Sequence, residues 1–332
     1  MEMRQVADIP RDGGWQYEPK WDGFRALAFR DGETVELQSK SGQPLARYFP
    51  EVVAALQALP AKRFVLDGEL VVASGGALAF DALQQRIHPA ASRIARLAAE
   101  TPAWYLVFDV LSYDGRELVD EPLAERRARL EEIAARFAAR GIVRLSPATR
   151  ELAVVDDWYE KVGIALDGVI AKRLDRPYAT GERTAAVKIK RIRSADCVVG
   201  GLRFASGDRE AVGSLLLGLY DDGGLLDYVG FTSAFSNDER RTLLKRLRPL
   251  FVKESFTGRT PGGPSRWNRG RAHDTTWQPL KPEVVVEVSF DQVTAGRFRH
   301  GTRPLRWRTD KAPRQCTLDQ MDVPDRTLTL LS

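Results

Sequence analysis

The residues most able to do chemistry lie close to the N-terminus, in the run Tyr17-Glu18-Pro19-Lys20-Trp21-Asp22-Gly23-Phe24-Arg25. Lys20 stands two residues after one acid and two residues before another, next to a turn between two strands. An amine is a good nucleophile only when it is neutral, so a catalytic lysine needs nearby cations or burial to lower its pKa from roughly 10.4. Lys20 is therefore a candidate nucleophile, and the alternative is a solvated lysine at a strand end.

Two further motifs pair acids with glycine. Asp67-Gly68-Glu69 interrupts an apolar strand at residues 63–72, and Asp167-Gly168 opens a strand that ends in Lys172 and Arg173. Carboxylates inside an apolar strand cost free energy unless they bind something. With only three scattered histidines and two cysteines in the chain, any metal should be held by oxygen ligands. The acids are candidate ligands of a hard cation, although the first motif could also be a β-bulge with exposed acids.

Cations and an aromatic side chain complete this set. Alternation in residues 185–191 places Lys188 and Lys190 on one face of a strand, where their charges repel unless an anion binds there. Phe108 and Asp109 lie near the end of an apolar strand at residues 104–111. The chain thus offers phosphate-binding cations, metal-binding carboxylates and a platform for an aromatic base.

Length and composition set the bounds. The chain has 332 residues, of which 43% are hydrophobic and 29% charged, as expected for a globular protein with two domains. It has no apolar run long enough to span a bilayer and no signal-peptide pattern at its start, so we expect a soluble, cytoplasmic protein. Cys197 and Cys316 are the only cysteines, which excludes a four-cysteine zinc site and argues against a disulfide scaffold.

The pattern of elements changes near residue 193. Residues 1–193 mix strands and helices, including a long helix at 122–139 whose charges are expected to form a solvated face. Residues 194–332 show five short strands with one helix between the third and the fourth, the order of an OB-fold barrel. We therefore predict an α+β chain, with antiparallel sheets and flanking helices at 1–193 and an all-β OB-fold domain at 194–332.

Most of the net charge of +5 lies in the second part. Two windows there, residues 255–273 and 292–309, contain arginines but no acid, with Trp267, Phe298 and Trp307 interleaved. Such windows are typical of nucleic-acid surfaces, and solvated basic loops are the alternative. The arginines expected to contact nucleic acid are Arg266, Arg269, Arg271, Arg297 and Arg299.

In order and spacing, these motifs resemble the series of the covalent nucleotidyltransferases, the superfamily of ATP-dependent DNA ligases, RNA ligases and mRNA capping enzymes. The run Arg306-Trp307-Arg308-Thr309-Asp310-Lys311 is similar to the last motif, which the OB domain carries. Within the superfamily, the whole chain looks most like the compact bacterial ATP-dependent DNA ligases associated with repair. Residues 1–193 would then be the adenylation domain.

This resemblance implies an enzyme that uses ATP and Mg²⁺, or Mn²⁺, to seal nicks between a 5′-phosphate and a 3′-hydroxyl in double-stranded DNA. Lys20 would attack the α-phosphate to give a lysyl-AMP, and the AMP would then pass to the nick as a DNA-adenylate. Lys188 and Lys190 would contact the α-phosphate. The residues that would orient the departing pyrophosphate are Arg308, Asp310 and Lys311. The enzyme would be a monomer, with end-joining or repair proteins supplied by separate chains.

The resemblance also assigns the metal and nucleotide ligands. Glu69 and Asp167 would hold the metal, and Phe108 would stack on adenine. Other polar residues would bind the adenine amino group, the ribose and the phosphates; they are Glu18, Arg25, Lys40 and Lys172.

Three departures from the usual ligase pattern leave metal preference and nick affinity open. Ligases usually carry glutamate where Asp167 stands, and arginine, which binds phosphate bidentately, where Lys40 stands. Ala186 replaces a large aromatic residue.

An RNA ligase or a capping-type guanylyltransferase shares the lysine chemistry and stays an alternative on the sequence alone. A non-catalytic OB-fold nucleic-acid-binding protein is an alternative from another class. The joint presence of Lys20, Glu69, Lys188 and Lys190 argues against it, because a binding module has no use for them.

Overall fold

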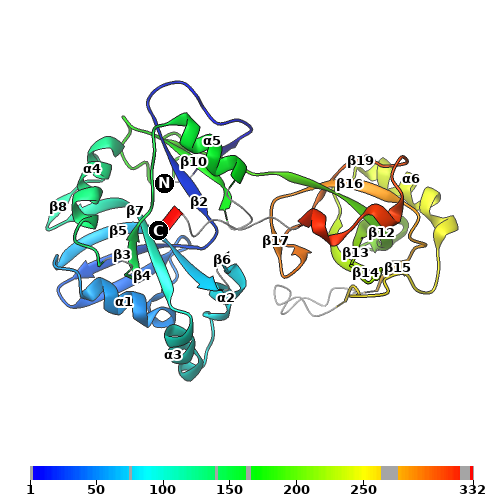
Figure 1. The fold of residues 1–332 in the computed structure, drawn as a ribbon, viewed down its shortest axis with the longest axis horizontal. Helices are drawn as coiled ribbons and strands as arrows, with labels where there is room; N and C mark the ends of the chain where they lie inside the picture. Colours follow the sequence, from blue (N-terminus) through cyan, green and yellow to red (C-terminus); the bar gives the residue numbers. More distant parts are fainter. Residues whose placement is uncertain are drawn as a thin grey trace. The chain divides into compact units, whose positions relative to one another are not determined.

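The computed structural model describes residues 3–74, 77–138, 141–161, 166–262, 276–321 and 330–331. The chain forms two compact units, residues 1–191 together with 323–332, and residues 192–322. Figure 1 shows the helices and strands of each unit. Among the described residues, no helix is long and apolar enough to cross a membrane.

The first unit is built on two sheets. Within the described ranges, the larger sheet has seven strands: β4 (Thr34–Ser39), β3 (Phe24–Asp31), β5 (Arg63–Ser74), β7 (Ala103–Tyr113) and β8 (Arg116–Glu117) in that order, with β6 (Ala77–Leu78) beside β5 and β9 (Val143–Leu145) beside β7. Its neighbouring strands are antiparallel except for the parallel pair of β7 and β9. The smaller sheet has four strands in the order β1 (Arg4–Val6), β11 (Ala186–Lys190), β10 (Leu166–Arg173) and β2 (Trp15–Trp21).

Helices accompany these sheets. They are α1 (Pro50–Gln57), α2 (Phe80–Gln85), α3 (Ala91–Glu100), α4 (Leu123–Ala134) and α5 (Leu152–Lys161), with the 3-10 turn η1 (Ala46–Tyr48) before α1. Helix α1 begins at the predicted Pro50, which suits the first helical turn because its missing N–H has no intrahelical partner there. Val52 and Leu56 of this helix are fully buried in the core of the larger sheet.

The core of the larger sheet follows from alternation along its strands. Ala28 of β3 lies opposite Leu66 of β5, and both are fully buried. Since successive side chains of a strand point to opposite faces, Asp67 and Glu69 must face away from the side that Leu66 occupies. The acids of β5 therefore point toward the second face of the sheet while its leucines form the core.

An ion pair inside the first unit fixes helix α4. Arg126 donates from Nε and Nη2 to Asp109 of β7, at 2.8 and 3.1 Å, and neither side chain is more than 1% exposed. Arg127 is also buried and donates to the carbonyl oxygen of Ser146 at 3.0 Å. The predicted solvated face of this helix was wrong for both arginines, because acceptors on neighbouring segments satisfy their guanidinium groups in the interior.

Replacing Arg126 by alanine is expected to lower the free energy of unfolding by about 3–5 kcal/mol, because Asp109 is then left as an unpaired buried charge. Urea unfolding followed by tryptophan fluorescence measures the change. The matched control is Arg129→Ala on the same helix, whose exposed ion pair with Glu132 should be worth about 0.5 kcal/mol or less. A similar small loss in both variants would contradict the role given to Arg126.

In its described residues, the second unit is an antiparallel barrel-like sheet with one α-helix. Its sheet order is β14 (Leu226–Thr232), β13 (Asp208–Tyr220), β12 (Arg193–Ala205), β16 (Val285–Phe290) and β19 (Arg303–Trp307), with β15 (Gln278–Pro279) beside β12. Strands β17 (Val293–Thr294) and β18 (Arg297–Phe298) form a separate hairpin. The other elements among the described residues of this unit are α6 (Asn237–Leu247) and the 3-10 turns η2 (Arg248–Leu250), η4 (Pro313–Gln315) and η5 (Leu318–Met321).

Helix α6 occupies the place that the sequence predicts, between the third and fourth long strands. It begins with a capping box, in which Ser236 Oγ accepts from the N–H of Glu239 while the Glu239 carboxylate accepts from the N–H of Ser236. Together with the strand order, this helix confirms the predicted fold class, a mixed α and β unit followed by an OB-fold.

Candidate active site

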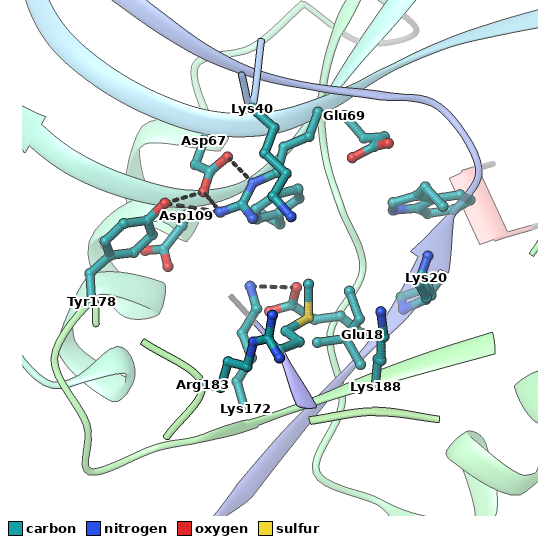
Figure 2. Close-up of a pocket in the computed structure, with 16 residues that line it drawn as sticks. Glu18, Lys20, Lys40, Asp67, Glu69, Asp109, Lys172, Tyr178, Arg183 and Lys188 are labelled. Atoms are coloured by element: carbon teal, nitrogen blue, oxygen red, sulfur yellow. Dashed lines mark hydrogen bonds and ion pairs between the residues drawn. The ribbon is translucent and has the colours of Figure 1, made fainter. Parts of the chain in front are cut away.

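A cleft of about 300 Å³ lies in the first unit, between strands of its two sheets. Figure 2 shows Lys40, Asp67 and Glu69 on one side of it and Glu18, Lys172 and Lys188 on the other. Most residues predicted to bind nucleotide or metal line this cleft, namely Glu18, Lys20, Arg25, Lys40, Glu69, Phe108, Lys172 and Lys188. The structure therefore brings together residues that lie far apart in the sequence.

Asp167 reaches Lys20 because strand β10 is irregular at Gly168. The pairing of β10 with β2 changes register between Leu166 and Val169, and Gly168 has a φ of +133°. A Cβ at this glycine would overlap the carbonyl oxygen of Ile189 on β11. The Asp-Gly pair is thus explained by a β-bulge that only glycine can form without strain.

Two lysines contact the carboxylate of Asp167, and a third interacts with them through its charge. Oδ2 of Asp167 lies 2.6 Å from Nζ of Lys20 and 3.4 Å from Nζ of Lys190. Asp167 and Lys190, which are predicted site residues outside the cleft lining, therefore lie next to Lys20, which is part of that lining. Lys188 is on the same face of β11 as Lys190, and its pKa is lowered by burial and by repulsion from Lys20 and Lys190. Three amines against one acid leave an excess of positive charge, which favours an anion at this end of the cleft.

Two carboxyl groups near Lys20 have oxygen atoms that could take a metal ion. Oδ1 of Asp167 is buried without a hydrogen-bond partner among the described residues, and Glu69 forms no ion pair or hydrogen bond with them. Burial raises the pKa of Glu69 to about 8, against the opposing effect of Lys20 and Arg25. Oxygen atoms of this kind fit a hard divalent cation. The described residues hold no cluster of three or more possible ligands, so phosphate oxygens and water would complete the coordination.

The far end of the cleft suits an aromatic base. Glu18 is only 1% exposed; it accepts a hydrogen bond from Nε2 of Gln16 at 2.9 Å and pairs with Nζ of Lys172 at 2.7 Å. The same Lys172 amine lies 4.5 Å from the ring centroid of Phe108. A partly buried aromatic ring near a fixed carboxylate offers both stacking and hydrogen bonding to a purine.

Arg25 is fixed by Asp67 and Tyr178, neither of which the sequence predicts as its partner. Its Nε and Nη2 donate to the carboxylate of Asp67 at 3.1 and 2.6 Å, and Nη2 also donates to the Tyr178 hydroxyl at 2.9 Å. The Tyr178 hydroxyl donates to Asp67 at 2.7 Å. Arg183 also lines the cleft and was not predicted. Asp67 belongs to the predicted Asp-Gly-Glu motif, but Tyr178 carries no local signal and is identified only by the fold.

Two family models match the chain. The ATP-dependent DNA ligase domain matches residues 3–190, and the C-terminal region of ATP-dependent DNA ligases matches residues 208–311. DNA ligase C1 of Mycolicibacterium smegmatis is 47% identical, over 98% of this chain and 93% of the relative.

This chain belongs to the ATP-dependent DNA ligase family.

More distant relatives agree with this assignment. The multifunctional non-homologous end joining DNA repair protein LigD of Mycobacterium tuberculosis is 34% identical to the ligase, over 90% of this chain and 37% of its own length. A solved structure described as belonging to Lig E DNA ligases covers 93% of this chain and 100% of that one, with a TM-score of 0.56 and 18% identity. That likeness supports the fold of the ligase.

In the second unit, the predicted residues of the last motif form one cluster. Nε and Nη2 of Arg308 donate to Asp310 at 2.9 and 2.8 Å. Arg308 and Lys311 both donate to Asp196, which the sequence did not predict. The hydrogen bond from Arg308 lowers the pKa of Asp310 to about 2. Asp310 is therefore ionised at any physiological pH.

The five arginines predicted to contact DNA fall in two places. Arg266, Arg269 and Arg271 lie outside the described residues. Arg297, in the β17–β18 hairpin, places its guanidinium 5.5 Å from the ring centroid of Tyr228. Arg299, just after the hairpin, donates to Oε1 of Gln292 at 2.6 Å. Their contact with DNA stays a prediction.

The raised pKa of Glu69 predicts a pH dependence for the metal-free ligase. An ordinary glutamate loses its proton near pH 4.5, whereas the folded Glu69 keeps it up to about pH 8. Between these values the folded state binds more protons than the unfolded state, so the free energy of unfolding should fall as pH rises.

Urea unfolding of the wild type and of Glu69→Gln in EDTA, from pH 5 to pH 8, measures this effect. The neighbouring charges of Lys20, Asp22, Arg25 and Asp67 are present in both proteins, so the difference in slope belongs to Glu69. That difference should approach one proton. Parallel curves for the two proteins would show that Glu69 is ionised in the folded state.

Proposed function

We propose that this ligase seals nicks in double-stranded DNA through a lysyl-AMP formed at Lys20, with ATP as the AMP donor. The observation that supports this best is the cluster of Lys20, Lys188 and Lys190 around Asp167. The side chain of Lys20 is 19% exposed and ion-paired, unlike a solvated lysine at a strand end. A cleft with a positive end and an aromatic end suits a nucleotide whose α-phosphate meets the amine.

In the first step, Nζ of Lys20 would attack the α-phosphorus of ATP. The P–N bond forms while the bond from the α-phosphorus to the bridging oxygen breaks, and pyrophosphate leaves. Oδ2 of Asp167, 2.6 Å from Nζ, is placed to accept the proton that the amine loses. Lys188 and Lys190 would hold the oxygens of the α-phosphate.

Glu69 and Asp167 would hold Mg²⁺ or Mn²⁺, which when bound would neutralise phosphate charge. The atoms proposed for this are Oδ1 of Asp167 and the carboxyl oxygens of Glu69, which have no hydrogen-bond partner among the residues that the structure describes. Asp167 is one methylene shorter than glutamate and already pairs with Lys20, so its contact with the metal would run through Oδ1 or a water molecule. Lys40, in the cleft lining, would add a point charge for phosphate.

At the other end, adenine would stack on the Phe108 ring. Glu18 would accept a hydrogen bond from the adenine amino group, since a carboxylate that already binds Gln16 and Lys172 can accept a further bond. Arg25, fixed by Asp67, would contact the ribose or the nick phosphate.

The later steps would transfer the AMP to DNA. The 5′-phosphate at the nick attacks the lysyl-AMP phosphorus, the P–N bond breaks and Lys20 is regenerated. The 3′-hydroxyl then attacks the activated 5′-phosphate, and AMP leaves as the phosphodiester forms. A role in repair is proposed from the end-joining name of LigD, with repair proteins on separate chains as partners of a monomeric ligase.

ATP labelled at the α-phosphate should leave its label covalently on the ligase in the presence of Mg²⁺, while γ-labelled ATP should not. Lys20→Ala should abolish the label, because Lys20 is the amine to which this proposal assigns the attack. Denaturing gel electrophoresis measures it, and GTP in place of ATP tests the guanylyltransferase alternative.

Lys62→Ala is the matched control for this experiment. Lys62 is exposed and paired with Glu33 in the same unit, so its loss should leave labelling unchanged. Normal labelling of Lys20→Ala would disprove the assigned nucleophile.

Nick binding should depend on salt, because arginines release counterions when they contact phosphates. If Arg297 and Arg299 each contact a phosphate, replacing both by glutamine should lower the slope of log affinity against log salt by about two. Fluorescence anisotropy with a labelled nicked duplex at several salt concentrations gives the slope. Arg129→Gln removes one charge elsewhere and should not change it; an unaltered slope in the double variant would place both arginines away from DNA.

A further inference from the structure

A buried carboxylate in the second unit holds two cations at once. Asp196, on β12, accepts from Nη1 of Arg308 at 3.0 and 2.9 Å and from Nζ of Lys311 at 2.8 Å. The side chain of Asp196 is 11% exposed. The remaining donors of Arg308 bind Asp310, so the guanidinium is fixed on both sides.

Hydrogen bonds to the main chain of Asp196 and of Arg308 fix both residues of this ion pair. The N–H of Asp196 donates to Oε1 of Gln320 at 2.9 Å, and the Asp196 carbonyl oxygen accepts from Nε2 of Gln320 at 3.2 Å. The N–H of Arg308 donates to the carbonyl oxygen of Val285 at 2.9 Å. The position of Asp196 relative to Arg308 is therefore set by the barrel and does not depend on the two side chains alone.

Charge explains why an acid is needed here. Nη1 of Arg308 and Nζ of Lys311 converge on one carboxylate, and two positive charges this close repel each other. Asp196 offsets that repulsion, so the two cations stay side by side. Without its charge they would separate into solvent. Adjacent cations suit a diphosphate group, whose charged oxygens lie on two neighbouring phosphorus atoms.

We infer that Asp196 is a positioning residue that holds Arg308 and Lys311 as a paired site for the β- and γ-phosphates of ATP. The inference rests on the proposed lysyl-AMP chemistry and on the role that the family resemblance implies for Arg308 and Lys311, the orientation of the departing pyrophosphate. Asp196 acts in self-adenylation and in its reversal, where pyrophosphate attacks the lysyl-AMP, the P–N bond breaks and ATP forms. It has no part in joining a nick that already carries AMP.

The test is Asp196→Asn, which keeps the shape of the side chain and removes its charge. Inorganic pyrophosphate is titrated against the adenylated ligase, and loss of AMP from the protein is followed by intact mass. The concentration for half-maximal discharge should rise by about tenfold or more, because a charge-assisted contact is lost. Sealing of a nick that already carries 5′-AMP should stay within about twofold of the wild type. Asp196→Glu should restore part of the pyrophosphate response.

A double-mutant cycle separates positioning from a structural role. If Asp196 acts through the two cations, adding Asp196→Asn to the pair Arg308→Ala and Lys311→Gln should cause no further loss. Glu210→Gln is the control within the same unit, since it breaks the exposed pair of Glu210 with Arg248. It should leave the pyrophosphate response unchanged.

A wild-type or stronger pyrophosphate response in Asp196→Asn overturns the inference. Equal losses in discharge and in sealing, with a lower melting temperature, would overturn it in favour of a structural role. Arg308→Ala distinguishes a failure of the proposed function. If Arg308→Ala self-adenylates at the wild-type rate, the role assigned to the last motif is wrong, whatever the result for Asp196→Asn. If Arg308→Ala self-adenylates slowly while Asp196→Asn responds normally to pyrophosphate, only the inference about Asp196 is rejected.

Discussion

The excess of positive charge around Asp167 is the constraint on which the proposed active site depends. Strand β10 carries this acid and pairs with β2 on one side and β11 on the other. Those two neighbours bring Lys20, Lys188 and Lys190 to it from opposite edges. Like charges would not gather in a flexible segment, so the rigidity of three paired strands keeps them together. The β-bulge at Gly168 then places the carboxylate of Asp167 beside these lysines.

On the other side of the cleft, two acids of strand β5 have different surroundings and therefore different proposed roles. Asp67 and Glu69 lie on the same face of β5, yet Asp67 is fully buried and bound by Arg25 and Tyr178, while Glu69 has no such partner in the described part of the chain. Its hydrogen bonds to Arg25 turn the first acid into a support for that guanidinium. Burial without pairing raises the pKa of the second, and a metal ion is the partner that would reverse this.

Much of the site could be predicted because its chemistry is local in sequence. A period of two places Lys188 and Lys190 on one face, and acid-glycine pairs mark the carboxylates. What could not be predicted are partners across the fold. Tyr178 meets Asp67 over 111 residues, and Arg308 meets Asp196 over 112. Helix α4 was predicted to have a solvated charged face for the same reason. Its local sequence does not show that Arg126 pairs with the buried Asp109 of another element.

The fold could be predicted at the level of class and order, because strand and helix patterns and the position of α6 are local signals too. The pairing of β1 with β11 was not visible, since it joins residues near 5 to residues near 188 in parallel. Pairings of this kind depend on burial in three dimensions, which a single sequence shows only as apolar residues.

Both proposed phosphate sites use the same device, a buried carboxylate that bridges two cations. Asp167 does so for Lys20 and Lys190, and Asp196 does so for Arg308 and Lys311. The two differ in their charge balance. Lys188 adds a third cation to the first site, whereas Asp310 adds a second acid to the other and brings it close to neutral.

For such a neutral cluster to bind an anion, one of its two carboxylates must lose its contact with the cations. Asp196 is buried and its main chain is hydrogen-bonded to Gln320, whereas Asp310 is 66% exposed and binds the Nε and Nη2 edge of the guanidinium from the solvent side. Asp310 is therefore the acid that phosphate oxygens would displace from Arg308. The proposed α-phosphate site would then be positive before ATP arrives, and the proposed pyrophosphate site would become positive only as its ligand enters. Such a difference would let the ligase hold AMP on Lys20 after pyrophosphate has gone.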